Sequence, residues 1–203
     1  MTLTTGSWDP ATPAGVAAIL ADCEAPWRIA GGYAIEFAVG RALRPHDNID
    51  VLMLRRDQWK ARAALSGWEL WVADPSGTLR PWLPSEWLPE GVHDVWCRRV
   101  PDGPWQLQIM LDESEGGQWL SRRNPDVRRP IEALGGVSPG GIPYLAPEIQ
   151  LYYKAKQPRP KDETDLAAVL PRLDASRRLW LGEAIRRTYG GGQAGLPLVA
   201  PSD

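Results

Sequence analysis

Residues 27–54 read WRIAGGYAIEFAVGRALRPHDNIDVLML, which predicts a strand, a helix and a second strand in succession. The short apolar run at 27–30 ends at a pair of glycines, and residues 33–41 carry apolar side chains at helical spacing. The run at 51–54 is too short and too apolar for anything but a buried strand or core segment. An α/β unit is therefore expected here.

A diglycine and a polar pair give this stretch its chemistry. Gly31 and Gly32 end a predicted strand, where glycine lets backbone N–H groups approach a ligand closely, and the N-terminus of the following helix favours anions. Asn48 and Asp50 are two residues apart, so in a strand both side chains point to the same face. Together these features predict a site where phosphate is held beside a metal ion.

These residues also carry a family resemblance. GGYAIEFAVGR (31–41) followed by HDNID (46–50) resembles the aminoglycoside and lincosamide nucleotidyltransferases of the polymerase-beta-type superfamily. A second segment, YLAPEIQLYYKAKQPRPKDETDL (144–166), is similar to the downstream lysine- and arginine-containing segment of that family. Order and spacing agree as well as residue types. The resemblance implies an α/β fold of the nucleotidyltransferase type, with a mixed sheet flanked by helices and a short helical C-terminal portion.

The resemblance implies roles for individual residues as well. The triphosphate of a nucleoside triphosphate would be bound by four of them: Gly31, Gly32, Lys154 and Lys161. Mg²⁺ would be held by Asp50 and by the residue at position 48. The implied reaction transfers a nucleoside monophosphate to a hydroxyl of a small, antibiotic-like acceptor and releases pyrophosphate.

This chain departs from the family pattern at two positions. The first metal carboxylate falls on Asn48, and the third, on a later strand, falls near Gln108. Mg²⁺ prefers anionic oxygen ligands, whereas an amide brings no charge and cannot act as a general base. Three interpretations stay open: an engineered Asn48, a nucleotide-binding or regulatory protein without turnover, or a divergent enzyme with a shifted carboxylate. Candidates for that carboxylate are Asp47, Asp94, Asp112 and Glu113.

Composition narrows the class of protein. A chain of 203 residues suits one domain, or a domain with a small helical appendage. The net charge of −2 weighs against a general nucleic-acid binder, although an RNA or protein acceptor stays a third hypothesis. Cys23, Cys97, His46 and His93 lack zinc-site spacing. Without a signal peptide or an apolar run of membrane length, a soluble cytoplasmic protein is expected.

The rest of the chain is predicted from local signals. Helices are expected at 13–23 after the Thr12 cap, at 58–65 after an Asp57 cap, and at 147–156, 160–170 and 175–189. A strand is expected at 68–73, and a hairpin at 92–100 and 105–111 around Pro-Asp-Gly-Pro. The predicted organisation is an α/β domain at 1–134, a helical portion at 144–189 and a flexible tail at 190–203.

Three further groups of side chains have two interpretations each. Gln108 and Asp112 alternate onto one face of the second hairpin strand, which makes them either catalytic candidates beside Asp50 or ordinary surface residues. Trp82 and Trp87 either face an acceptor or cover the edge of the sheet. The arginines at 122, 123, 128 and 129 either meet phosphates or form a solvated loop.

Overall fold

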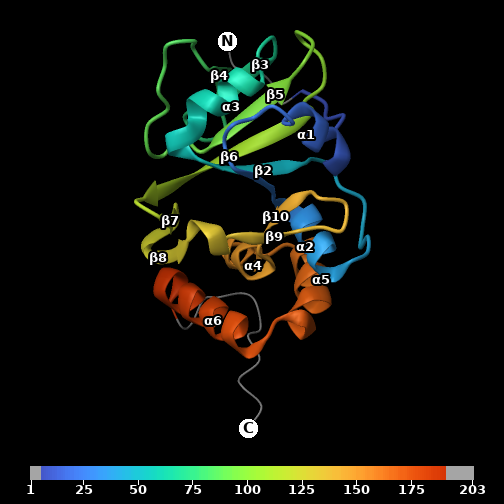
Figure 1. Ribbon diagram of the computed structural model, residues 1–203, viewed down its shortest axis with the longest axis vertical. Helices are drawn as coiled ribbons and strands as arrows, with labels where there is room; N and C mark the ends of the chain where they lie inside the picture. Colours follow the sequence, from blue (N-terminus) through green and yellow to red (C-terminus); the bar gives the residue numbers. More distant parts are fainter. Residues whose placement is uncertain (1–5, 191–203) are drawn as a thin grey trace.

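The computed structural model describes residues 6–190, so the tail predicted from 190 onward lies outside the described residues except for Gly190. Its central feature is a mixed sheet in the order β4-β3-β5-β6-β2-β1-β10-β9, which β7 and β8 extend from the end of β6 (Figure 1). The strands are β1 (Trp27–Ile29), β2 (Asp50–Leu54), β3 (Glu69–Ala73), β4 (Leu79–Pro81), β5 (Asp94–Arg98), β6 (Leu107–Glu115), β7 (Gln118–Ser121), β8 (Asn124–Pro130), β9 (Gly135–Val137) and β10 (Pro143–Leu145).

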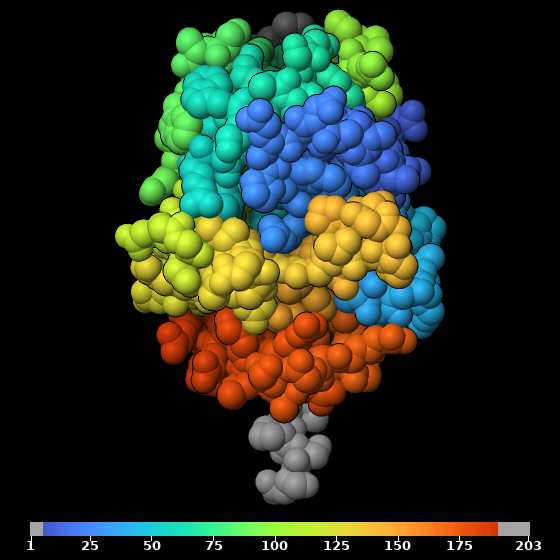
Figure 2. Space-filling view, in the orientation of Figure 1, coloured from blue at the N-terminus to red at the C-terminus, as the bar shows by residue number. Residues whose placement is uncertain are grey.

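Helices cover both faces of this sheet. They are α1 (Pro13–Ile19), α2 (Gly31–Val39), α3 (Gln58–Ala64), α4 (Pro147–Lys154), α5 (Pro160–Val169) and α6 (Ala175–Tyr189), with short 3₁₀ turns at Arg55–Asp57, Ile131–Ala133 and Leu170–Arg172. Figure 1 shows α1 and α3 on one side of β2 and β6, and α2, α4, α5 and α6 on the other. In Figure 2, α5 and α6 form one end of the molecule.

The alternation of side chains along β2 explains the two layers. Val51 and Met53 are buried in a core with residues of α1 and α3, whereas Leu52 and Leu54 are buried in a second core with α2, α4, α5 and α6. A strand with apolar side chains on both faces is stable only when both faces are covered. The apolar run at 51–54 therefore requires helices on each side of the sheet.

Local signals explain where several helices begin and end. The Thr12 hydroxyl accepts the Gly15 N–H at 3.0 Å ahead of α1, and the Asp174 carboxylate accepts the Arg177 N–H at 2.9 Å ahead of α6. Gly40 ends α2 with a positive φ of 80°. The helix predicted after Asp57 does begin at Gln58, but the Asp57 side chain makes no capping hydrogen bond.

The predicted α/β class with a mixed sheet is confirmed. β1 and β2 are antiparallel, β2 and β6 are parallel, and β5 and β6 form the predicted hairpin, with Val95 paired to Ile109. The start predicted for the central helix was wrong, because α2 includes the diglycine in its first turn. No strand was predicted within 118–130 or 135–145, where the structure has β7 to β10.

The strands β9 and β10 lie beyond residue 134, the predicted end of the α/β domain. β10 pairs in parallel with β1, so these residues extend the same sheet, and α4, α5 and α6 share a core with it. Both cysteines are free thiols. None of the helices within residues 6–190 has the length and apolar character to span a bilayer.

Candidate functional site

A pocket of about 330 Å³ opens where the start of α2 meets β2, the β7–β8 turn and the α4–α5 connection. It includes the predicted Gly31, Gly32, Asn48 and Asp50. Seven of its side chains are cationic, namely Arg44, Arg122, Arg123, Lys154, Lys156, Arg159 and Lys161. Only two are carboxylates, Asp50 and Asp162. Arg44, Lys154 and Arg159 are paired with Asp162 or Asp165, so the positive charge available to a ligand comes from the other four, and it favours a ligand with several negative charges.

The glycines bring the first turn of α2 against the strand that carries Asp50. Gly31 has a φ of 65°, and a Cβ placed on it would lie 2.5 Å from Asp50 Oδ2. A Cβ on Gly32 would overlap the His46 ring. The Gly31 N–H donates to Gln150 Oε1 at 2.8 Å, so α4 is anchored at this same point. Only glycine permits this close approach with a left-handed backbone.

Gly31→Ala is expected to lower the free energy of unfolding by about 1–3 kcal/mol, because the new Cβ adds left-handed backbone strain and displaces Asp50. Chemical denaturation measures this change. Gly182→Ala in α6 is the matched control, since a Cβ there has open space and alanine favours a helix. Equal stability of the two variants would contradict the packing described here.

Asp50 is the one strand carboxylate that lines the pocket, and its partner is an amide. Asn48 lies two residues before Asp50, the first residue of β2, and its Nδ2 donates to Asp50 Oδ1 at 2.8 Å. Burial raises the pKa of Asp50 to about 6, and the nearby carboxylate of Asp94 adds to the rise. Asp50 is therefore mostly ionised at neutral pH, yet basic enough to accept a proton.

The donor set does not suit a protein-held Mg²⁺ ion. The amide of Asn48 turns its N–H toward Asp50, which leaves one carboxylate where a metal site of this type needs at least two anionic ligands. Within residues 6–190, no group of three or more His, Cys, Asp or Glu side chains is placed to hold a metal ion. The predicted metal pair of Asp50 and Asn48 is brought together, but its chemistry is that of a hydrogen-bonded pair.

The two predicted catalytic residues on β6 have different positions. Gln108 is in register with Asp50 on the neighbouring strand, but it is not among the residues that line the pocket. Asp112 is fully buried and accepts hydrogen bonds from Trp119 Nε1 and Tyr153 Oη, both at 2.7 Å. Asp112 therefore holds two aromatic side chains in the core and is not among the residues that line the pocket.

The other shifted-carboxylate candidates also lie outside the lining of the pocket. Asp94 on β5 is close enough to influence Asp50, but its own nearest cation is Arg122, at 3.6 Å. Glu113 accepts from Arg55 Nε at 2.6 Å on the far part of β6. The exposed Asp47 lies 3.8 Å from Lys161 Nζ. Among these candidates in the described part of the chain, Asp94 lies nearest to Asp50 in its electrostatic effect, but none of the three is among the lining residues.

Both predicted nucleotide-binding lysines line the pocket, in different environments. Lys154 is buried, with its Nζ 2.5 Å from Asp162 Oδ1 and 3.0 Å from Asp165 Oδ2. Lys161 is partly exposed at the start of α5. Burial raises the pKa of Asp162, but hydrogen bonds from Arg159 and Lys154 outweigh it and hold that pKa well below its ordinary range. Lys154 thus fixes the pocket wall, while Lys161 contacts only the exposed Asp47, at 3.8 Å, among the described carboxylates.

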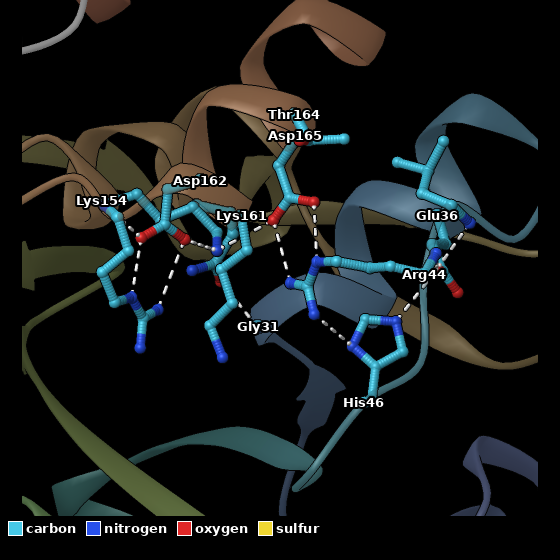
Figure 3. A network of polar contacts seen from close by, with 12 residues as sticks. Gly31, Glu36, Arg44, His46, Lys154, Lys161, Asp162, Thr164 and Asp165 are labelled. Carbon is cyan, nitrogen blue, oxygen red and sulfur yellow. Dashed lines mark hydrogen bonds and ion pairs between the residues drawn. The ribbon is translucent and has the colours of Figure 1, made fainter.

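A polar network joins this wall to the loop before β2, as Figure 3 shows. Arg44 donates from Nη2 to Asp165 Oδ2 at 3.1 Å and lies 3.2 Å from His46 Nδ1. His46 Nε2 in turn lies 2.9 Å from Glu36 Oε1 on α2. The loop that carries Asn48 is therefore tied to both α2 and α5, which preorganises the pocket.

Several lining residues were missed or only half identified. The four-arginine cluster divides: Arg122 and Arg123 line the pocket, whereas Arg128 pairs with Glu115 and Arg129 with Glu148. Arg44, Gln150 and Arg159 were not assigned to the site, although the last follows the Lys-rich segment in sequence. Trp82 and Trp87 do not line it, and the buried Trp82 packs beside Trp59 near the β4 edge.

No protein-family model matches the chain, and no curated protein matches its sequence. Solved structures with a similar fold do exist. The solution structure of the antibiotic-resistance factor ANT(2'')-Ia superposes with a TM-score of 0.56 at 21% identity, covering 86% of this chain and 89% of that one.

Two crystal structures give similar values. ANT(2'')-Ia in complex with adenylyl-2''-tobramycin superposes with a TM-score of 0.53 at 17% identity, over 85% of this chain and 94% of that one. The lincomycin-bound lincosamide antibiotic adenylyltransferase LnuA gives 0.50 at 15% identity, over 76% and 92%. With its sheet, covering helices and pocket described, this chain has the fold of the aminoglycoside and lincosamide nucleotidyltransferases.

Proposed function

We propose that this protein binds a nucleoside triphosphate in the pocket at the start of α2 and transfers its nucleoside monophosphate to a hydroxyl of a small acceptor. The observation that carries the proposal is the set of seven cationic side chains around the diglycine and Asp50. A triphosphate is a ligand whose charge matches this set. The likeness in fold to antibiotic adenylyltransferases supports a small, antibiotic-like acceptor.

The transfer uses groups that the pocket already contains. Asp50, with its pKa of about 6, accepts the proton of the acceptor hydroxyl. The hydroxyl oxygen forms a bond to the α-phosphorus as the bond from that phosphorus to the bridging oxygen breaks, and pyrophosphate leaves. Lys161, Lys156 and Arg123 neutralise the charge on the departing oxygens, which is the main requirement of phosphoryl chemistry.

A second candidate function is nucleotide binding without turnover. The neutral Asn48 and Gln108 favour it, because both stand where the related enzymes are expected to carry carboxylates. In this case the pocket binds the triphosphate but releases no pyrophosphate. The two candidates agree on the ligand and differ only in the reaction.

Asn48→Asp tests both candidates. Two adjacent carboxylates repel each other and attract a divalent ion, so Mg²⁺ is expected to raise the melting temperature and the nucleotide affinity of this variant but not of the natural chain. Calorimetry with ATP, GTP, CTP and UTP, together with a pyrophosphate assay, measures the response. Asn124→Asp is the matched control, since it makes the same charge change on β8, outside the pocket.

The outcomes separate the candidates. Pyrophosphate release by the natural chain with a hydroxylated acceptor supports transfer. Nucleotide binding with no release, followed by release in Asn48→Asp, supports the candidate without turnover. If none of the four nucleotides binds to either protein, the proposed function is wrong.

A further inference from the structure

Arg122 is the more deeply packed of the two arginines that the β7–β8 turn contributes to the lining of the pocket. It follows β7 directly, in the turn to β8, and lines the pocket with a side chain that is only 10% exposed. Its guanidinium lies over the Tyr153 ring at 5.1 Å, and Nη2 lies 3.7 Å from Met110 Sδ. A planar cation packed in this way keeps one orientation.

The carboxylates near Arg122 leave part of its hydrogen-bonding capacity unused. Nη1 lies 3.6 Å from Asp94 Oδ1 and Nε lies 3.7 Å from Asp112 Oδ1, both beyond hydrogen-bond distance. Among the described residues, Nε and Nη1 have no hydrogen-bond partner. Leaving a buried donor unpaired costs free energy, which a ligand oxygen in the pocket would recover. The charge also acts on Asp50, whose pKa it lowers against the larger effect of burial.

We propose that Arg122 is a built-in cation that binds the triphosphate directly, so that nucleotide binding by this protein needs no divalent metal ion. This inference rests on the proposed function and adds how the charge of the ligand is neutralised. With neutral side chains at Asn48 and Gln108, fewer carboxylates are present to attract a metal ion. The guanidinium of Arg122 lies near the carboxylate that is present, Asp50, and supplies positive charge in place of the metal ion.

The charges around the pocket predict whether Mg²⁺ raises or lowers the affinity for a nucleoside triphosphate. A divalent ion on the triphosphate cancels part of its negative charge. Arg44, Lys154 and Arg159 are already paired with Asp162 or Asp165, but four lining cations have no carboxylate within hydrogen-bond distance among the described residues: Arg122, Arg123, Lys156 and Lys161. The metal-free triphosphate is the better electrostatic match. Affinity measured in EDTA should therefore equal or exceed affinity measured with Mg²⁺.

The experiment is calorimetric titration of ATP, GTP, CTP and UTP into the full chain, once with EDTA and once with excess Mg²⁺. Arg122→Gln is expected to weaken binding in EDTA about 10- to 100-fold, the usual range for losing a charge-assisted hydrogen bond. Arg122→Lys keeps the positive charge but lacks the paired N–H donors of the guanidinium, so it should recover part of the lost affinity. Arg128→Gln is the control, because Arg128 lies on the adjoining strand and pairs with Glu115 outside the pocket.

Each outcome has a distinct meaning. Binding that appears only with Mg²⁺ overturns the inference about Arg122 but leaves the proposed function standing. Binding in EDTA that Arg122→Gln and Arg122→Lys both leave unchanged also overturns it. If no nucleotide binds under either condition, the proposed function itself fails. Melting curves show whether Arg122→Gln is folded, and if it is not, Arg122→Lys decides the test.

Discussion

Asp50→Asn should slow pyrophosphate release by about 10²–10⁴-fold, the usual contribution of a general base. The same substitution should raise the melting temperature at neutral pH. Burial raises the pKa of Asp50 to about 6, so the ionised carboxylate is less stable in the folded protein than in the unfolded chain. An asparagine keeps an oxygen for the Asn48 hydrogen bond and removes the buried charge.

The pH dependence of this gain follows from the sign of the shift. A carboxyl group with a raised pKa in the folded state binds its proton more tightly there, so stability falls as pH rises from about 4 to about 6. The natural chain and the variant should differ little below this window, and by about 1–3 kcal/mol above it. Denaturation at pH 4 and at pH 8 measures the difference.

Asp47→Asn provides the matched control for Asp50→Asn. Asp47 is exposed, lies three residues before Asp50 in the segment that leads into β2, and is not among the lining residues. Its substitution should leave both stability and pyrophosphate release almost unchanged. If Asp47→Asn abolished release while Asp50→Asn did not, the proton acceptor would be Asp47.

Lys154→Met should lower the free energy of unfolding by about 1.5–3 kcal/mol, the cost of losing a charge-assisted contact, because Asp162 keeps Arg159 and Asp165 keeps Arg44 as partners. Asp162 and Asp165 are both almost fully buried, and both contact the Lys154 ammonium. Methionine fills a similar volume without the charge, so the decrease in the free energy of unfolding measures the lost electrostatic contact rather than lost packing. For a chain of this size, the melting temperature should fall by about 3–12 °C.

Lys156→Met is the control, because this exposed lysine lines the pocket two residues further on. It should weaken nucleotide binding without a comparable loss of stability. The pH response also differs. The depressed pKa of Asp162 stabilises the natural chain above about pH 4, and this contribution is lost on acidification. Lys154→Met should show a weaker acid dependence; an unchanged profile and melting temperature would contradict the network.

Local patterns predicted the elements that depend on short-range signals. The Thr12-Pro13 start of α1 and the hairpin of β5 and β6 follow from cap and turn residues that are adjacent in sequence. The contact between Asn48 and Asp50, two residues apart, is equally local. The strands β7 to β10 were missed because their Gly-, Pro- and Arg-rich sequences resemble loops.

The sequence by itself determined the α/β class, the diglycine against a strand carboxylate, and the amide at position 48. Only the tertiary structure decided which charges share the pocket. Arg44, Arg122 and Arg159 come from three separate segments and meet through long-range pairing of β2 with β6 and packing of α5. The tertiary structure also places Arg128 beside Glu115 and Arg129 beside Glu148, outside the pocket. The physical reason is that the strength of an ion pair depends on the distance between the two groups and on their burial. The spacing of residues in the sequence specifies these distances only within one helix or one strand.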